Sequence, residues 1–305
     1  MPKTSCFYSN MNPRVHPTAE TPLQPVPGGV YLCQVGETVS CGACCGLYNC
    51  AKASRGLLEE LIAWRTTEFQ KVPRTPDAIT DFRVKMERRD PRPRPYPDFY
   101  HCPFLGFVGA RHLRVGCLLH PQADGNQGID YRGLSFYGAM ACRDYFCPTY
   151  RNLPAAYKEI VQTVCTDWYT YGLVITEERM LAGFFGEVER RLGRSLTTAD
   201  IQSSPDARTA VADFLELKLS WPFRRPDWQG VGNYFFNDNR YLPPAIDYAR
   251  IGAARSAHDI ILQELSSAFS SPGELKAAET MIERLLERVR RPVTSLDAPL
   301  RDRTW

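Results

Sequence analysis

The sequence predicts a mainly α-helical protein with an irregular, cysteine-rich N-terminal half and little β structure. Apolar residues recur with the spacing of amphipathic helices over most of the second half of the 305-residue chain. All eleven cysteines lie at or before residue 165. The 24 prolines cluster before residue 100, where they interrupt regular structure.

The first hundred residues contain two predicted helices between irregular segments. Residues 1–30 carry six prolines and few apolar runs, so we expect an extended N-terminal arm. Residues 55–70 have the apolar spacing of an amphipathic helix, and a second, short helix is expected over 76–88. The proline-rich stretch 90–97 ends that helix, because proline cannot continue it. Residues 98–153 are rich in glycine and are expected to be irregular.

The remaining chain is predicted to be mostly helical. Ser204 and Pro205 are favoured types for a helix N-cap and first position, and the segment 271–274 has the pattern of a capping box. The predicted helices cover 154–171, 176–192, a segment beginning at Pro205, 245–270, and 272 to about 290. An aromatic-rich connector, 221–242, joins the last two of these to the others.

Charge and hydropathy argue against two kinds of partner. The 37 basic and 34 acidic residues give a net charge of +3, which is too balanced to indicate nucleic acid or an anionic membrane surface. No apolar run approaches the roughly 18 residues of a membrane span. The first residues also lack the apolar core of a secretory signal. We therefore expect a cytoplasmic protein, in which thiols stay reduced.

The first group of cysteines has metal-ligand spacing. It reads Cys33-x7-Cys41-x2-Cys44-Cys45-x4-Cys50. The Cys-x2-Cys step lets two thiolates turn onto one metal ion. The side chains of the adjacent Cys44 and Cys45 point in different directions, so both rarely reach one mononuclear ion. This pair suggests either two nearby sites or one cluster of several metal atoms.

Two further groups bring the number of candidate thiols to eight. The candidate metal ligands are Cys33, Cys41, Cys44, Cys45, Cys102, Cys117, Cys142 and Cys147. Four thiolates close one tetrahedral zinc site or one iron–sulfur cluster, so eight could serve two sites, or one site with spares. Cys50 is an open extra. Cys6 and Cys165 are expected to be ordinary small apolar residues.

Histidine and arginine side chains near these groups are weaker candidates. His101, His112 and His120 lie around the second group, and Cys117-x2-His120 has ligand spacing. A lone histidine is nevertheless more often a surface or hydrogen-bonding residue, so each is left open as a ligand. Arg143 is predicted to assist cofactor binding, because a guanidinium can donate to thiolate or sulfide sulfur and offset negative charge. An ordinary ion pair with Asp144 is the alternative.

These motifs resemble the YkgJ-type cysteine-cluster family, described as a zinc- or iron-chelating domain. The family pattern is Cys-x2-Cys-Cys, then Cys-Pro-Phe-Leu, a lone Cys, and Cys-Arg-x-aromatic-x-Cys. In this chain the four motifs occur in the same order, at 41–45, 102–105, Cys117 and 142–147. The resemblance covers about residues 31–150 and implies that these cysteines chelate zinc or iron. It departs from the family between 118 and 141, where the connection is longer and contains no Arg-Pro.

Three functions are compatible with the sequence. The first is a metal-binding protein that holds an iron–sulfur centre of the 4Fe–4S type, or zinc. Such a protein could transfer electrons or bind a redox or protein partner. The second is an enzyme with a cluster, resembling the flagellin lysine methylases that carry a related cysteine pattern. The third is a structural zinc protein whose helical half binds a partner. The excess of thiols over histidines favours a multinuclear centre, although thiolates suit both metals.

The chain accordingly divides into four segments. These are an arm (1–30), a cysteine-cluster metal-binding region (31–153), a helical region packed on it (154–292) and a tail (293–305). No phosphate-binding loop, dinucleotide fingerprint or Gly-x-Ser-x-Gly motif is present, so the sequence assigns no catalytic residue and does not decide whether the protein is an enzyme.

Overall fold

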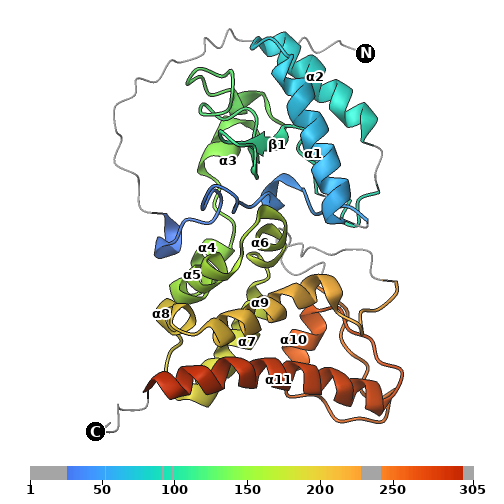
Figure 1. The fold of residues 1–305 in the computed structure, drawn as a ribbon. Helices are drawn as coiled ribbons and strands as arrows, with labels where there is room; N and C mark the ends of the chain where they lie inside the picture. Colours follow the sequence, from blue (N-terminus) through green and yellow to red (C-terminus); the bar gives the residue numbers. More distant parts are fainter. Residues whose placement is uncertain (1–25, 52, 91–92, 98, 228–241, 298–305) are drawn as a thin grey trace, which may run out of the picture.

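The structure is a computed structural model that describes residues 26–51, 53–90, 93–97, 99–227 and 242–297. Its helices form two parts, with the segment 26–51 running between them (Figure 1). A single two-stranded sheet accompanies the helices in the described chain. The predicted fold class, mainly helical with little β structure, is therefore confirmed.

The first part is built on two helices that begin where the sequence predicts. Helix α1 spans Arg55–Gln70 and helix α2 spans Pro76–Arg89. Each is preceded by a hydroxyl side chain that accepts a backbone N–H of the first turn, Ser54 for α1 and Thr75 for α2. Because these signals are local, the sequence places both helices correctly.

A short hairpin packs beside α1 and was not expected from the sequence. Strand β1 (Leu105–Val108) pairs antiparallel with strand β2 (Arg114–Cys117). Phe104 precedes β1 and lies with its ring centroid 6.1 Å from that of Phe69 in α1 and 5.8 Å from that of Phe82 in α2. The hairpin is thereby fixed to both helices. Strands of four residues are too short to produce a clear alternating pattern in the sequence.

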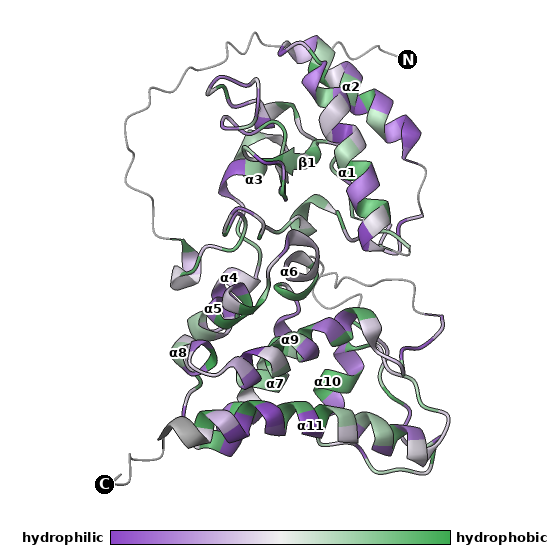
Figure 2. Ribbon diagram, viewed as in Figure 1, coloured by the Kyte–Doolittle hydropathy of each residue, from purple (hydrophilic) through white to green (hydrophobic). Residues whose placement is uncertain are grey.

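The second part is a helical assembly with one continuous apolar interior. The remaining helices are α3 (Gly138–Asp144), α4 (Thr149–Asn152), α5 (Ala155–Val164), α6 (Trp168–Val174), α7 (Glu178–Leu192), α8 (Thr198–Gln202), α9 (Pro205–Ser220), α10 (Asp259–Glu264) and α11 (Pro272–Asp297). Helices α4 to α11 make up this part, and hydrophilic and hydrophobic residues alternate along the long helix α11 (Figure 2). Phe184 of α7 and Phe214 of α9 stack inside it, with ring centroids 3.7 Å apart.

Three predicted helices differ from the observed ones. The segment 154–171 is not one helix, because Asp167 interrupts it and caps α6 by accepting two backbone N–H groups. The helix expected over 245–270 is wrong, since only Asp259–Glu264 is helical there. Arg250 in that segment instead donates to the carbonyl of Phe269, at 2.8 Å. The last helix continues past residue 290 to Asp297, with Pro292 inside it.

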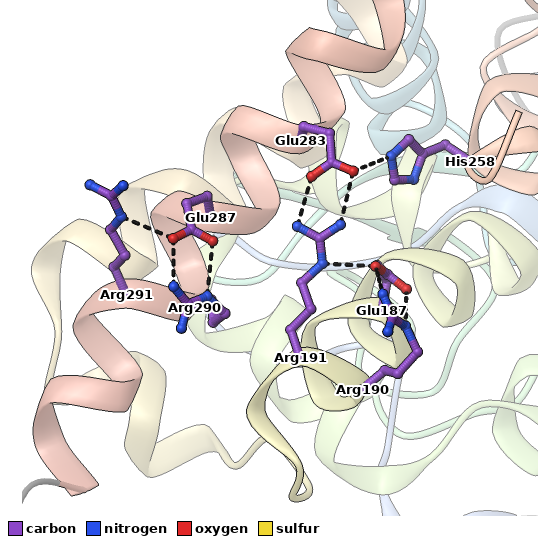
Figure 3. Close-up of polar contacts among 8 residues, drawn as sticks. All are labelled: Glu187, Arg190, Arg191, His258, Glu283, Glu287, Arg290 and Arg291. Carbon is purple, nitrogen blue, oxygen red and sulfur yellow. Dashed lines mark hydrogen bonds and ion pairs between the residues drawn. The ribbon is translucent and has the colours of Figure 1, made fainter.

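Charged side chains join the helices of the second part. Arg191 of α7 donates to both carboxylate oxygens of Glu283 in α11, at 2.7 and 2.9 Å, and Glu283 also bonds to His258 at 2.8 Å (Figure 3). Deeper in the molecule, Lys218 of α9 forms a 2.9 Å ion pair with Glu177, whose side chain is fully buried. The first set joins α7 to α11 near the surface, and the second lies in the interior.

The main apolar core does not stop at the predicted boundary after residue 153. It contains Leu32 and Leu47 of the segment that carries the first cysteine group, together with Val161 and Phe214 of the helical region. The chain around the cysteines therefore shares its interior with the helices that follow. Across the described residues, no helix combines the length and the apolar character needed to cross a membrane.

The tail and most of the arm lie largely outside the described residues. This applies to 1–25 of the arm, to 298–305 of the tail and to Cys6. Much of the aromatic connector, 228–241, also lies outside them.

Candidate metal centre

The first cysteine group lies in a tight loop held by backbone hydrogen bonds. Cys41 donates its N–H to the carbonyl of Cys33 at 2.9 Å, which places the two residues side by side. The next residues form a single 3-10 turn, Ala43–Cys45, that ends at Gly46 with a φ of 78°. The N–H of Ala43 points at the sulfur of Cys41, 3.5 Å away. Such N–H···S bonds stabilise a thiolate, which is the form that binds metal.

Tyr150 brings the third cysteine group to the first. Its hydroxyl lies 3.3 Å from the sulfur of Cys33 and accepts the N–H of Leu32 at 2.8 Å. Its own N–H bonds to the carbonyl of Cys147 at 3.1 Å. Tyr171 holds the same stretch from the other side, because its hydroxyl donates to the carbonyl of Leu32 at 3.0 Å. Cys33 and Cys147 are thereby fixed near each other although 114 positions separate them in the sequence.

The second cysteine group joins the first at Cys45. The N–H of Cys102 donates to the carbonyl of Cys45 at 2.9 Å. The hairpin then brings Cys117 of β2 opposite Leu105 of β1, three residues after Cys102. Cys142 lies in α3, and its sulfur is 2.9 Å from the hydroxyl of Ser135.

Hydrogen bonding between thiols orders their protonation in this cluster. Side-chain hydrogen bonding with Cys45 lowers the pKa of the Cys44 thiol and that of the Cys102 thiol. The same bonds, first to Cys102 and then to Cys44, raise the pKa of Cys45 well above its ordinary value. Cys44 and Cys102 are therefore the two candidate thiols whose pKa lies below its ordinary value.

Burial dominates the protonation of the other candidate thiols. It raises the pKa of Cys33 to about 12 and that of Cys147 to about 11, and nearby thiolates raise both further. Burial likewise raises the pKa of Cys41, Cys117 and Cys142. Thiols of this kind lose their protons readily only when a cation stabilises the thiolate.

Three buried or half-buried cationic side chains lie close to the cysteine segments, and the sequence analysis did not predict them. Arg65 donates to the carbonyl of Cys102 at 3.2 Å. Arg132 reaches the carbonyl of Cys142 at 3.5 Å. Lys158, whose side chain is fully buried, donates to the carbonyls of Tyr150 and Gly28 at 2.8 and 2.9 Å. Positive charge beside a group of thiolates offsets their mutual repulsion.

Arg143, the predicted cofactor-binding residue, has a different position. Its side chain is about half exposed and forms a bidentate ion pair with the neighbouring Asp144, with both hydrogen bonds at 2.9 Å. Arg132 occupies the place beside Cys142 that the sequence assigned to Arg143. The contact of Arg132 depends on how the segment around 130–135 folds back, which local spacing does not reveal.

The side chains left open as ligands all have protein partners. His101 is buried and hydrogen-bonds to the carbonyl of Asn49. His112 is paired with Asp124 at 2.8 Å, and His120 accepts the N–H of Gln122 at 3.2 Å. Two further cysteines, Cys50 and Cys165, are buried among apolar residues of the main core.

The eight candidate thiols fit a metal centre by their chemistry. Every cysteine that the structure describes is a free thiol. Sulfur ligands suit iron–sulfur clusters and zinc, and the N–H and O–H groups directed at several of them are typical of such sites. Within the described ranges, no three Cys, His, Asp or Glu side chains already converge in the geometry that holds a metal ion.

Comparison with family models, with curated proteins and with solved structures finds no match to this chain.

Proposed function

We propose that the chain is a metal-binding protein that holds an iron–sulfur centre, or zinc, through the clustered cysteines. One observation carries the proposal: free thiols from separate segments lie near one another, since Tyr150 contacts both Cys33 and Cys147, and Cys102 is hydrogen-bonded to Cys45. Cys50 and Cys165 lie within the main apolar core, as ordinary small core cysteines do. A membership in the YkgJ-type family and a cytoplasmic location remain parts of this proposal.

The thiols would be the ligands, and the surrounding groups would adjust them. When bound, an iron–sulfur cluster of the 4Fe–4S type supplies reversible one-electron chemistry, which suits transfer to a redox partner. The N–H of Ala43 and the hydroxyls of Tyr150 and Ser135 stabilise negative charge on sulfur. Arg65 and Arg132 add positive charge nearby.

The test is purification of the full chain without air, followed by metal and acid-labile sulfide analysis. Iron, sulfide and broad visible absorbance would support the cluster. We expect Cys44→Ser and Cys142→Ser to lower the metal content sharply, whereas Cys165→Ser, a matched thiol in the apolar core, leaves it unchanged. Unchanged metal content in the first two variants would overturn the proposal.

A structural zinc protein is the second candidate, and the position of the cysteines favours it. The loop that carries Cys33 to Cys45 runs between the two parts of the molecule (Figure 1). A closed tetrahedral zinc site there would cross-link them. Colourless protein that contains zinc and unfolds when a chelator is added would support this function over the cluster.

A further inference from the structure

We propose that a cavity where α1, α6 and α9 meet binds a small zwitterion, which is a free amino acid or a short peptide with an ammonium and a carboxylate group. Glu216 would bind the ammonium group, and Arg224 would bind the carboxylate group. None of the residues that line the cavity is a cysteine, so this inference does not depend on the proposed metal-binding function.

The cavity has the size of a site for a small organic molecule. Its volume is about 570 Å³, within the range of roughly 300–1,000 Å³ that is usual for such sites. Residues from the start of α1, the start of α6 and the second half of α9 line it, together with Arg224. Ala53 and Leu219 add apolar surface to an otherwise polar wall.

Two of the four charged groups on the cavity wall are already paired with each other. Arg55 of α1 lies 2.8 Å from a carboxylate oxygen of Asp167, the residue that caps α6. The same oxygen accepts the N–H groups of Tyr169 and Thr170, at 2.8 and 3.0 Å. The hydroxyl of Tyr169 donates to the carbonyl of Ala53 at 2.7 Å. These contacts fix α1 to α6, and they leave the charges of Arg55 and Asp167 balanced.

Glu216 is a negative charge on the same wall without a cation of its own. It is an exposed residue of α9, and within the described chain its carboxylate forms no ion pair or hydrogen bond. Burial by the cavity wall raises the pKa of Glu216, and the negative charge of Asp167 adds to this, whereas Arg55 opposes it. An ammonium group in the cavity would supply the missing positive charge.

Arg224 is a positive charge without a carboxylate of its own. One end of its guanidinium donates to the carbonyl of Lys218 at 2.5 Å and lies 3.5 Å from that of Leu217. Its buried Nε has no acceptor, and among the described residues no carboxylate forms an ion pair with it. Burial lowers the pKa of Arg224, and the charge of Glu177 opposes this only in part. A carboxylate in the cavity would offset the cost of burying this cation.

The two unmatched charges define the class of ligand. They have opposite signs, so a simple cation would satisfy Glu216 alone and a simple anion would satisfy Arg224 alone. A helical side chain leaves the backbone towards the N-terminus, which directs Glu216 along α9 away from the carbonyls of its last turn, where Arg224 is bound. A molecule that carries an ammonium and a carboxylate group at separate positions can reach both. Free amino acids and short peptides share this chemistry, and their apolar side chains suit the surface of Leu219.

Calorimetric titration of the full, reduced chain with L-leucine and with the dipeptide leucyl-leucine tests the inference. Each zwitterion is compared with its N-acetylated form, which lacks the ammonium group, and with its amide, which lacks the carboxylate group. We expect at least one zwitterion to bind, and both of its modified forms to bind roughly tenfold more weakly or worse, because each loses a hydrogen bond between charged groups. The tighter of the two zwitterions identifies the source, amino acid or peptide.

Substitutions on the cavity wall should remove one preference at a time. In Glu216→Gln the zwitterion and its N-acetylated form should bind about equally, while the preference for a free carboxylate remains. Arg224→Gln should give the reverse result. Asp213→Asn is the matched control, because Asp213 is an exposed carboxylate of α9 that pairs with Arg288 and does not line the cavity. It should keep both preferences, and circular dichroism verifies that every variant keeps its helices.

The other outcomes overturn the inference and leave the proposed metal-binding function standing. If neither zwitterion binds the unmodified chain at millimolar concentration, the cavity is not such a site. Equal binding of a zwitterion and its two modified forms would mean that the charges on the wall recognise nothing. Because Glu216 is exposed, its variant is expected to fold even where Arg224→Gln does not. An undiminished preference for the free ammonium group in Glu216→Gln is therefore sufficient by itself to refute the assignment.

Discussion

Gly46 connects the conformation of the cysteine loop to its stability. Its φ is 78°, and a Cβ at this position would overlap with the carbonyl oxygen of Tyr100 and lie 3.1 Å from His101. Gly193, after α7, has a similar φ of 71°, but a Cβ there would meet nothing within 4 Å. The two glycines therefore separate backbone strain from steric overlap.

The expected costs follow from these two situations. A left-handed backbone costs an L-residue about 1–2 kcal/mol, so Gly193→Ala should lower the free energy of unfolding by that amount. Gly46→Ala carries the same strain and adds about 1–3 kcal/mol for overlap in a packed region, which gives about 2–5 kcal/mol in total. The overlap also pushes the chain before Cys102 away from Cys45, to which Cys102 is hydrogen-bonded.

Urea unfolding of both variants, followed by far-UV circular dichroism under reducing conditions, measures the difference. We expect Gly46→Ala to be the less stable variant by at least about 1 kcal/mol. If the two alanine variants lose the same stability, the close approach of residue 46 to Tyr100 does not constrain the loop, and the reasoning is wrong.

Three further changes probe other parts of the molecule. Tyr150→Phe leaves the N–H of Leu32 without its acceptor and should cost about 1–3 kcal/mol in urea unfolding. Lys218→Met removes the lysine that forms an ion pair with the buried carboxylate of Glu177 and should cost about 3–5 kcal/mol in the same assay. Hydrogen bonds, first from Arg190, lower the pKa of Glu187 to about 2, so its stabilisation is complete above about pH 4.5 and is lost as the pH falls towards 2. The free energy of unfolding of Glu187→Gln should therefore fall less than that of the unmodified chain between pH 5 and pH 2. The expected difference is roughly 1 kcal/mol, because solvent screens this partly exposed group.

Controls and contradicting results differ among the three. Lys276→Met removes an exposed lysine paired at 3.7 Å with Glu279 and should change stability by less than about 1 kcal/mol. Equal effects of Lys218→Met and Lys276→Met would mean that the interior ion pair contributes nothing. An unaltered unfolding midpoint in Tyr150→Phe would show that Leu32 finds another acceptor. A parallel acid dependence in Glu187→Gln and the unmodified chain would place the titrating group elsewhere.

Local signals explain which parts of the fold the sequence predicts well. Helix α1 follows Ser54, and α2 follows Thr75 with Pro76 at its first position, so both starts are encoded by neighbouring residues. The prediction of a helix over 245–270 is wrong because the apolar residues of this segment serve tertiary packing. Tyr248 there bonds to Asp259 at 2.6 Å across eleven positions, and no helical spacing encodes such a contact.

The same distinction applies to the candidate site. The cysteine spacing predicts the candidate thiols without any knowledge of the fold, because metal ligands of particular types recur at short intervals. The approach of Cys147 to Cys33, and of Cys102 to Cys45, depends on contacts between distant segments. Lys158 and Arg132 were missed for that reason, since each reaches the thiol region only after the chain has folded back.

The bond between Leu32 and Tyr150 has a consequence for how the protein is made. Its two residues are 118 positions apart, and the chain that holds the first cysteines emerges from the ribosome long before its partner does. At roughly 5–20 residues per second, the wait is on the order of ten seconds. Throughout that interval the thiols of the early segment are without the tyrosine and cysteine that later enclose them. The contacts that hold the first cysteine segment are thus completed late in biosynthesis.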